Sequence, residues 1–201
     1  LEYNKRINRP TFWNLNPYRS LLTAYAYYDG NPALKPEYTN QIEVGHRYKE
    51  LLYSSLYYRH TSGGFDNLTV GSLDTFLVYR TPLNFLTTST WGIQQRANLA
   101  PTNWWETALQ FNLYYTDSKS NLDYVADQAG WGEYFSIGNT FYLTKNKNFS
   151  GAVNFWCQFP EVDHIGTTNT YNSLDLGLRY TTPNKKWALG LNATDILKNS
   201  C

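Results

Sequence analysis

The chain has 201 residues, of which 42% are hydrophobic and 16% charged, and its 17 basic residues nearly balance its 16 acidic ones. This composition excludes a disordered or collagen-like chain, and the balanced charge provides no basic face for nucleic acid. Aromatic residues are frequent, with 18 Tyr, 10 Phe and 7 Trp. They favour β-strands and suit surfaces that are apolar on one side and wet on the other. A helical membrane protein is excluded, because every apolar stretch falls far short of about 18 residues.

Apolar and polar residues alternate with period two along most of the chain, which predicts strands rather than helices. The expected strands are residues 1–8, 38–48, 51–61, 84–100, 104–117, 131–144, 149–159, 171–182 and 187–194. Several of these nine strands exceed the usual length of about five or six residues. The sequence therefore predicts an all-β, antiparallel protein.

The connections between these strands alternate between long and short. The long ones are residues 9–37, 62–83, 118–130 and 160–170, and the short ones are residues 49–50, 101–103, 145–148 and 183–186. Bacterial outer-membrane barrels have short turns at one rim and long loops at the other. We therefore expect all four short turns at one end of the sheet.

The clearest strands have one apolar and one polar face, with Tyr or Trp near the strand ends. The residues expected to face lipid are Leu109, Phe111, Leu113, Leu176, Leu178, Leu189 and Leu191. A soluble antiparallel sheet that covers a core also alternates in this way. Strand length, aromatic residues at the ends and unequal loops together favour the membrane barrel over the soluble sheet.

Three short motifs lie at the start of the first long connection or within it. They are Arg-Ile-Asn-Arg-Pro at residues 6–10, Leu-Asn-Pro at 15–17 and Gly-Asn-Pro-Ala-Leu-Lys-Pro-Glu at 30–37. Pro32 and Pro36 fix φ and favour an extended residue before each of them, while Gly30 permits a turn. The simplest interpretation is that these residues shape the loop without touching a ligand.

These motifs, in this order, resemble the C-terminal half of TonB-dependent outer-membrane receptors, in particular the Bacteroidetes-type outer membrane protein β-barrel family. Residues 192–197, Asn-Ala-Thr-Asp-Ile-Leu, are similar to a segment near the end of such barrels. The resemblance implies an up-and-down transmembrane β-barrel in the bacterial outer membrane. It also implies the uptake of a scarce nutrient, such as a siderophore or a glycan, driven by a TonB-type energy-coupling protein that acts through a plug domain.

The chain differs from a complete receptor in three respects: it has no plug domain, an odd number of strands and no terminal aromatic strand. Large transporters of this type close at about 22 strands. We therefore expect residues 1–201 to be part of a single barrel domain whose plug and remaining strands lie outside this segment. The expected partners are outer-membrane lipid, the coupling protein, and other outer-membrane or surface subunits.

Motifs for catalysis are absent from the sequence: it has no nucleotide-binding glycine loop and no nucleophile elbow. Glu161-Val162-Asp163-His164 supplies no defined metal geometry, and Cys157 and Cys201 are too far apart for a metal or redox motif. The chain is therefore expected not to be an enzyme and to need no metal or cofactor.

Ligand contacts are expected from the long connections. The candidates are Tyr25, Tyr27, Tyr28 and Asp29 in the first connection, and Phe65, Asp66 and Asn67 in the second. They combine aromatic faces with polar groups, although such residues also hold loops in shape. Two further functions remain open: a soluble, aromatic-rich carbohydrate-binding domain and a structural outer-membrane protein without transport.

Overall fold

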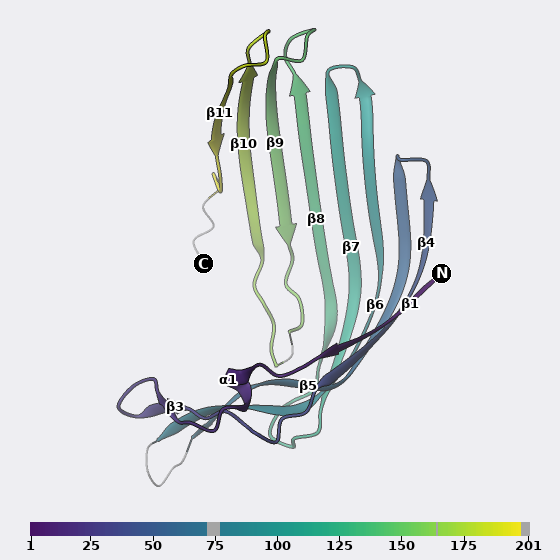
Figure 1. Cartoon of the computed structure of the whole chain (residues 1–201). Helices are drawn as coiled ribbons and strands as arrows, with labels where there is room; N and C mark the ends of the chain where they lie inside the picture. Colours follow the sequence, from purple (N-terminus) through teal and green to yellow (C-terminus); the bar gives the residue numbers. More distant parts are fainter. Residues whose placement is uncertain (72–76, 164, 198–201) are drawn as a thin grey trace.

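The computed structural model describes residues 1–71, 77–163 and 165–197. These residues form one sheet of 11 strands, nine of which follow one another as an antiparallel meander (Figure 1). The strands of the meander are β1 (Glu2–Asn8), β4 (Glu37–Tyr48), β5 (Leu52–Gly71), β6 (Val78–Thr102), β7 (Trp105–Ser120), β8 (Gln128–Tyr142), β9 (Phe149–Gln158), β10 (Tyr171–Thr181) and β11 (Ala188–Ala193). They correspond one to one to the nine strands predicted from the sequence.

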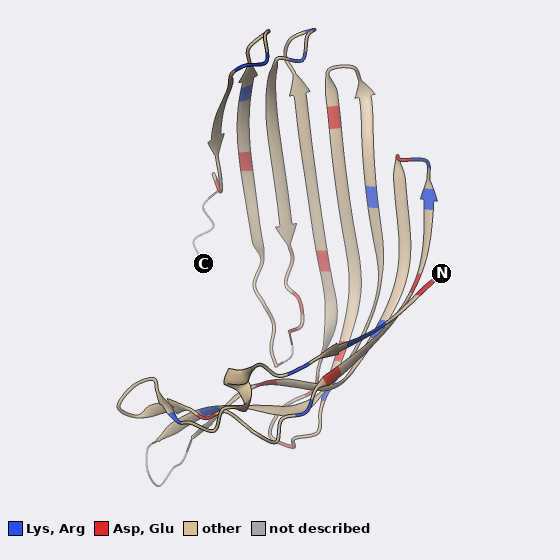
Figure 2. Ribbon diagram, in the orientation of Figure 1, with Lys and Arg blue, Asp and Glu red and all other residues tan. Residues whose placement is uncertain are grey.

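The two ends of the sheet are unlike, as predicted. The short turns that join β4 to β5, β6 to β7, β8 to β9 and β10 to β11 lie together at the top of Figure 1, and the long connections lie at the bottom. Lys and Arg residues lie at several of the short turns (Figure 2). β1 and β11 are the two edges of the sheet, which is open in the structure.

Residues 62–83 are the main departure from the sequence prediction. The sequence predicts a long connection here, but β5 continues to Gly71 and β6 begins at Val78. Gly63 interrupts the alternation because its φ of 68° is left-handed, and the register of β5 against β6 shifts beside it. The paired extension beyond this irregularity turns away from the direction of the other strands (Figure 1).

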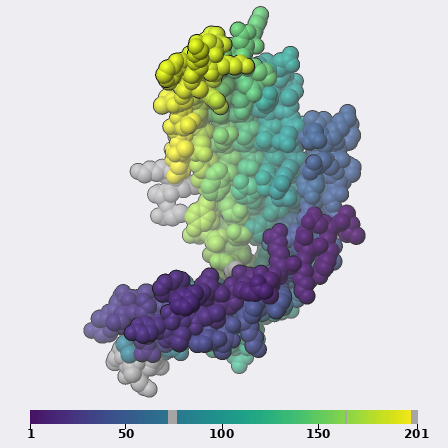
Figure 3. Space-filling model, in the orientation of Figure 1, coloured from purple at the N-terminus to yellow at the C-terminus, as the bar shows by residue number. Residues whose placement is uncertain are grey.

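The first long connection contains short elements that the sequence analysis did not predict. They are the helix α1 (Phe12–Leu15) and the strands β2 (Ser20–Leu21) and β3 (Ala26–Tyr28). β2 pairs with β3, and β3 pairs in parallel with the start of β6. Residues at the N-terminal end of the chain cover the lower part of the molecule in Figure 3. In the described ranges no helix is long and apolar enough to cross a membrane.

The sheet has a polar face and an apolar face. On the polar face Tyr57 donates a hydrogen bond to Asn112 at 3.2 Å, linking β5 to β7 across Gly92 of β6. On the apolar face Ile93 of β6 pairs with Leu113 of β7. The residues predicted to face lipid share the apolar face; of these, Phe111, Leu176, Leu178, Leu189 and Leu191 are 38%, 43%, 46%, 68% and 71% exposed.

Two clusters of aromatic rings lie at the two ends of the apolar face. Trp91, Tyr115 and Trp131 lie near the long connections, with ring centroids 5.1 to 5.8 Å apart. At the short-turn end, Trp105 and Phe141 stack at 6.3 Å, and Trp104 contacts both. Amphipathic rings at two levels of a barrel mark its two membrane interfaces.

The buried core lies in the extension of β5 and β6, beyond the aromatic cluster near the long connections. Leu68, Phe85 and Leu86 are 8%, 2% and 3% exposed. Leu122 and Val125, from the connection between β7 and β8, pack against them. The long-connection end is therefore a folded unit with its own apolar core.

Candidate functional site

The first connection is held against the β5–β6 extension by the motif at residues 30–37. Asn31 donates through its backbone to Asn14 at 2.7 Å and through its side chain to the Pro82 carbonyl at 3.0 Å. The amide of Asn84 accepts from the backbone of Lys35 at 2.7 Å and donates to the Lys35 carbonyl at 2.9 Å. These bonds give the motif a loop-shaping role, as expected from its Pro, Asn and Gly residues.

Gly30 allows the two limbs of this connection to approach closely. A Cβ atom built on Gly30 would lie 2.2 Å from the carbonyl oxygen of Asn16. A side chain therefore does not fit without displacing the backbone that follows α1. Gly30 is buried, so the close approach is part of the packed structure.

A small side sheet forms where β2, β3, β6 and β5 lie next to one another. Ser20 pairs with Tyr28, Tyr28 with Arg80, and Arg80 with Thr69, so these four residues form one row across four strands. The parallel pairing of β3 with β6 joins residues about fifty positions apart in the chain. This row forms part of the lining of a cavity.

The cavity, which we call the outer pocket, has a volume of about 330 Å³. Its lining residues come from the first long connection, which includes α1, β2 and β3, and from the β5–β6 extension. They are Trp13, Asn16, Tyr18, Ser20, Leu22, Tyr28, Asn67 and Arg80. The volume is at the lower end of the range of about 300–1,000 Å³ for small-molecule sites. The lining offers aromatic rings, amides, hydroxyls and one guanidinium to a ligand.

Two of the seven residues proposed from the sequence, Tyr28 and Asn67, line the outer pocket. Tyr27 instead stacks on Tyr79 with centroids 5.6 Å apart, and the guanidinium of Arg19 lies 4.0 Å from the Tyr27 ring. Asp29 forms an ion pair with Arg19 at 3.3 Å. These residues hold β3 and its neighbours in shape.

The remaining three proposed residues lie apart from the outer pocket's lining. Asp66 accepts a hydrogen bond from the Asn67 backbone at 2.6 Å, and Phe65 pairs with Asn84 in the extension. Tyr25 is 69% exposed, and its carbonyl accepts from the Val78 backbone at 2.9 Å. The sequence analysis did not single out Trp13, Tyr18 or Arg80. The many aromatic residues of the first long connection were a signal for Trp13 and Tyr18, but not for Arg80.

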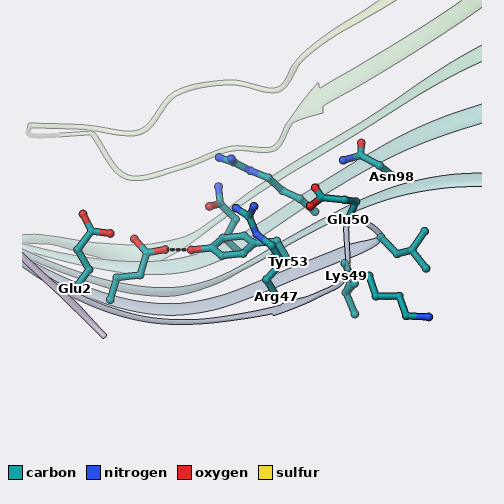
Figure 4. Close-up of a pocket in the computed structure, with 11 residues that line it drawn as sticks. Glu2, Arg47, Lys49, Glu50, Tyr53 and Asn98 are labelled. Atoms are coloured by element: carbon teal, nitrogen blue, oxygen red, sulfur yellow. Dashed lines mark hydrogen bonds between the residues drawn. The ribbon is translucent and has the colours of Figure 1, made fainter.

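The polar face carries a cavity of about 480 Å³ at its short-turn end (Figure 4). Tyr53 donates to the carboxylate of Glu43 at 2.7 Å on this surface. The lining mixes both charges, with Glu2, Glu43 and Glu50 beside Arg47, Lys49 and Arg96. Such a surface is hydrophilic without attracting ions of one sign.

A second cavity of the polar face, of about 460 Å³, lies nearer the long connections. Its lining includes Thr90, Gln110 and Asn112, and the connection between β9 and β10 closes one side of it. Tyr114 donates a hydrogen bond to Glu161 of that connection and accepts one from Gln158 at 3.1 Å. The connection is thereby tied to the polar face.

Within the described ranges no three His, Cys, Asp or Glu side chains gather in a way that could hold a metal ion. Glu161 of the Glu-Val-Asp-His run bonds to Tyr114, and His164 lies outside the described residues. Cys157 is a buried free thiol, and Cys201 also lies outside the described residues.

Comparisons with known proteins agree with this architecture. The model of the Outer membrane protein beta-barrel family matches residues 1–200. Among solved structures, the siderophore receptor PirA from Pseudomonas aeruginosa is similar, with a TM-score of 0.65 and 11% identity over 98% of this chain. The chain spans 36% of that receptor's length.

A search of curated proteins finds no match. The family match covers nearly every residue, and the structural likeness independently supports the same fold. The chain therefore belongs to the Outer membrane protein beta-barrel family and is a protein of the bacterial outer membrane.

Proposed function

We propose that this chain forms part of the wall of an energy-coupled outer-membrane transporter. In this proposal the end with the long connections faces the outside of the cell, as in other outer-membrane barrels, and captures a scarce nutrient such as a siderophore or a glycan. The polar face lines the path inward. The role is binding and passage rather than catalysis. The polar face of a barrel wall encloses its lumen, and the apolar face meets lipid.

The observation that carries the proposal is the division of one sheet into these two faces. The polar face holds cavities of about 480 and 460 Å³ that are lined mainly by amides, hydroxyls and charges. On the apolar face Leu176 and Leu178 of β10, a strand paired on both sides, are 43% and 46% exposed, which suits contact with lipid chains. A soluble carbohydrate-binding domain would bury such a row in a core.

The open edges support a larger barrel. Unpaired backbone groups in hydrocarbon cost several kcal/mol each, so we propose that further strands pair with β1 and β11. These strands belong to the rest of the same polypeptide in this proposal, as does a plug domain that contacts a TonB-type coupling protein. The likeness to a receptor of which this chain spans 36% supports this arrangement.

The proposal is tested by deleting the full-length gene and measuring growth on single sources of iron and of carbon. We expect the deletion to abolish growth on one scarce nutrient, and the intact gene to restore it. Uptake of that nutrient should stop when a protonophore removes the proton gradient. Unchanged uptake of every nutrient in the deletion strain would instead favour a structural protein without transport.

A further inference from the structure

The outer pocket presents aromatic rings that serve neither the core nor the membrane interfaces. Trp13 and Tyr18 are 72% and 82% exposed and lie on the first long connection, beyond both aromatic clusters of the apolar face. Tyr28 adds a third ring from β3. Open Trp and Tyr faces on the outer end of a membrane protein are platforms on which a ring-shaped ligand can stack.

Asn67 supplies a buried acceptor to the same pocket. Its side-chain oxygen Oδ1 is shielded from solvent and has no hydrogen-bond partner in the described part of the chain. A rotation of the Asn67 amide towards the pocket would let a ligand donate a hydrogen bond to Oδ1, which relieves the cost of an unpaired buried acceptor. The ligand therefore carries hydroxyl or amine groups, since a purely apolar ring would leave Oδ1 unpaired.

Arg80 supplies a positive charge to the pocket. Its side chain is exposed, and the ion pairs found among the described residues leave it out. Arg19 of the first long connection is instead paired with Asp29 at 3.3 Å. A guanidinium recognises carboxylates through two parallel hydrogen bonds, so Arg80 favours an acidic ligand.

We propose that the outer pocket binds an acidic sugar, with its ring on Trp13 and Tyr18, a hydroxyl donating to Asn67 and its carboxylate on Arg80. Ser20 and Asn16 offer further hydrogen bonds along the ring edge. Hydroxyls spread around a saturated ring suit polar groups that come from three separate segments. This inference deepens the proposed transport function and rests on it for the fate of the ligand.

The test is calorimetric titration of the full-length protein in a detergent whose headgroup is not a sugar. The probes are three acidic sugars, namely digalacturonate, dimannuronate and N-acetylneuraminate, with the neutral disaccharide galactobiose and with 2,3-dihydroxybenzoate. We expect at least one acidic sugar to saturate a single site and to bind at least about tenfold more tightly than galactobiose, since hydrogen bonds to charged groups are the stronger ones.

Variants separate the contributions of the rings and the charge. Arg80→Gln should reduce the preference for the acidic sugar to less than about threefold, and Tyr18→Ala should weaken both kinds of sugar. Tyr25→Ala, on the same connection, and Arg179→Gln, an exposed arginine of β10, are matched controls that should change affinity less than about twofold. Heat-modifiable migration checks that every variant is folded.

Three results would overturn the inference: no binding of any acidic sugar, equal binding of galactobiose, or tighter binding of dihydroxybenzoate. Binding in detergent needs no uptake. If the deletion strain takes up every nutrient normally but the purified protein binds an acidic sugar, only the proposed transport function is refuted. If the protein binds no acidic sugar but the deletion abolishes uptake of a nutrient, only this site is refuted.

Discussion

Trp105 and Tyr115 lie on the same face of β7, ten residues apart, and each belongs to a different cluster of aromatic rings. Ten residues of an antiparallel strand extend over about 34 Å. At the strand tilt of about 40° found in outer-membrane barrels this length spans about 26 Å of membrane, which matches an apolar band of about 25 Å. The spacing of the two clusters along β7 therefore fits one bilayer.

The two faces of β7 should differ in their tolerance of charge. Phe111→Arg should lower the free energy of unfolding in lipid vesicles by about 2–4 kcal/mol, because the side chain would enter the lipid band. The neighbouring Asn112→Arg should cost about 1 kcal/mol, mainly through the lost hydrogen bond from Tyr57. Denaturant titration of the full-length protein measures both, and equal losses would contradict the assignment of the faces.

Gly30→Ala should disturb the wall of the outer pocket. The new Cβ would lie 2.2 Å from the Asn16 carbonyl, so the backbone has to move at a cost of about 1–3 kcal/mol. Hydrogen exchange should become faster at the Asn31 amide, which bonds to Asn14. Gly71→Ala is the control, because its Cβ would meet no atom within 4 Å. Equal exchange in the two variants would show that Gly30 is not needed for the close approach.

Tyr114→Phe should release the connection between β9 and β10 from the polar face. The change removes the hydrogen bond to Glu161, and bonds to charged groups contribute about 1.5–3 kcal/mol. Backbone amides of residues 161–163 and 165–170 should then exchange at least about tenfold faster, as followed by mass spectrometry. Tyr124→Phe, at a residue that is 69% exposed, is the control. Unchanged exchange in Tyr114→Phe would mean that other contacts hold the connection.

The sequence was informative about the meander because each strand's environment repeats every two residues. Lipid on one side and a polar surface on the other make the alternation in residues 104–117 visible without any tertiary contact. The extension of β5 and β6 was missed because it leaves the lipid band. There Gly63 and Pro82 interrupt the pattern, and Leu68 and Phe85 are buried in a local core.

The outer pocket was only partly foreseeable for a different reason. Tyr28 and Asn67 stood out as an aromatic ring and an amide in expected loops, and both line it. Arg80 joins them through the parallel pairing of β3 with β6, a contact between distant segments that no local pattern encodes. Trp13 is placed by α1, a helix of 4 residues, which is too short to produce a periodic signal.

The most direct test of the account is a spin-label scan along β7 of the full-length protein in lipid vesicles. Single cysteines replace residues 105–116 in turn, in a background in which Cys157 and Cys201 are changed to serine. We predict that collisions with oxygen alternate with period two and peak at positions 109, 111 and 113, falling towards positions 105 and 115. Oxygen collisions without alternation, or with maxima at positions 110 and 112, would contradict a membrane wall with the faces assigned above.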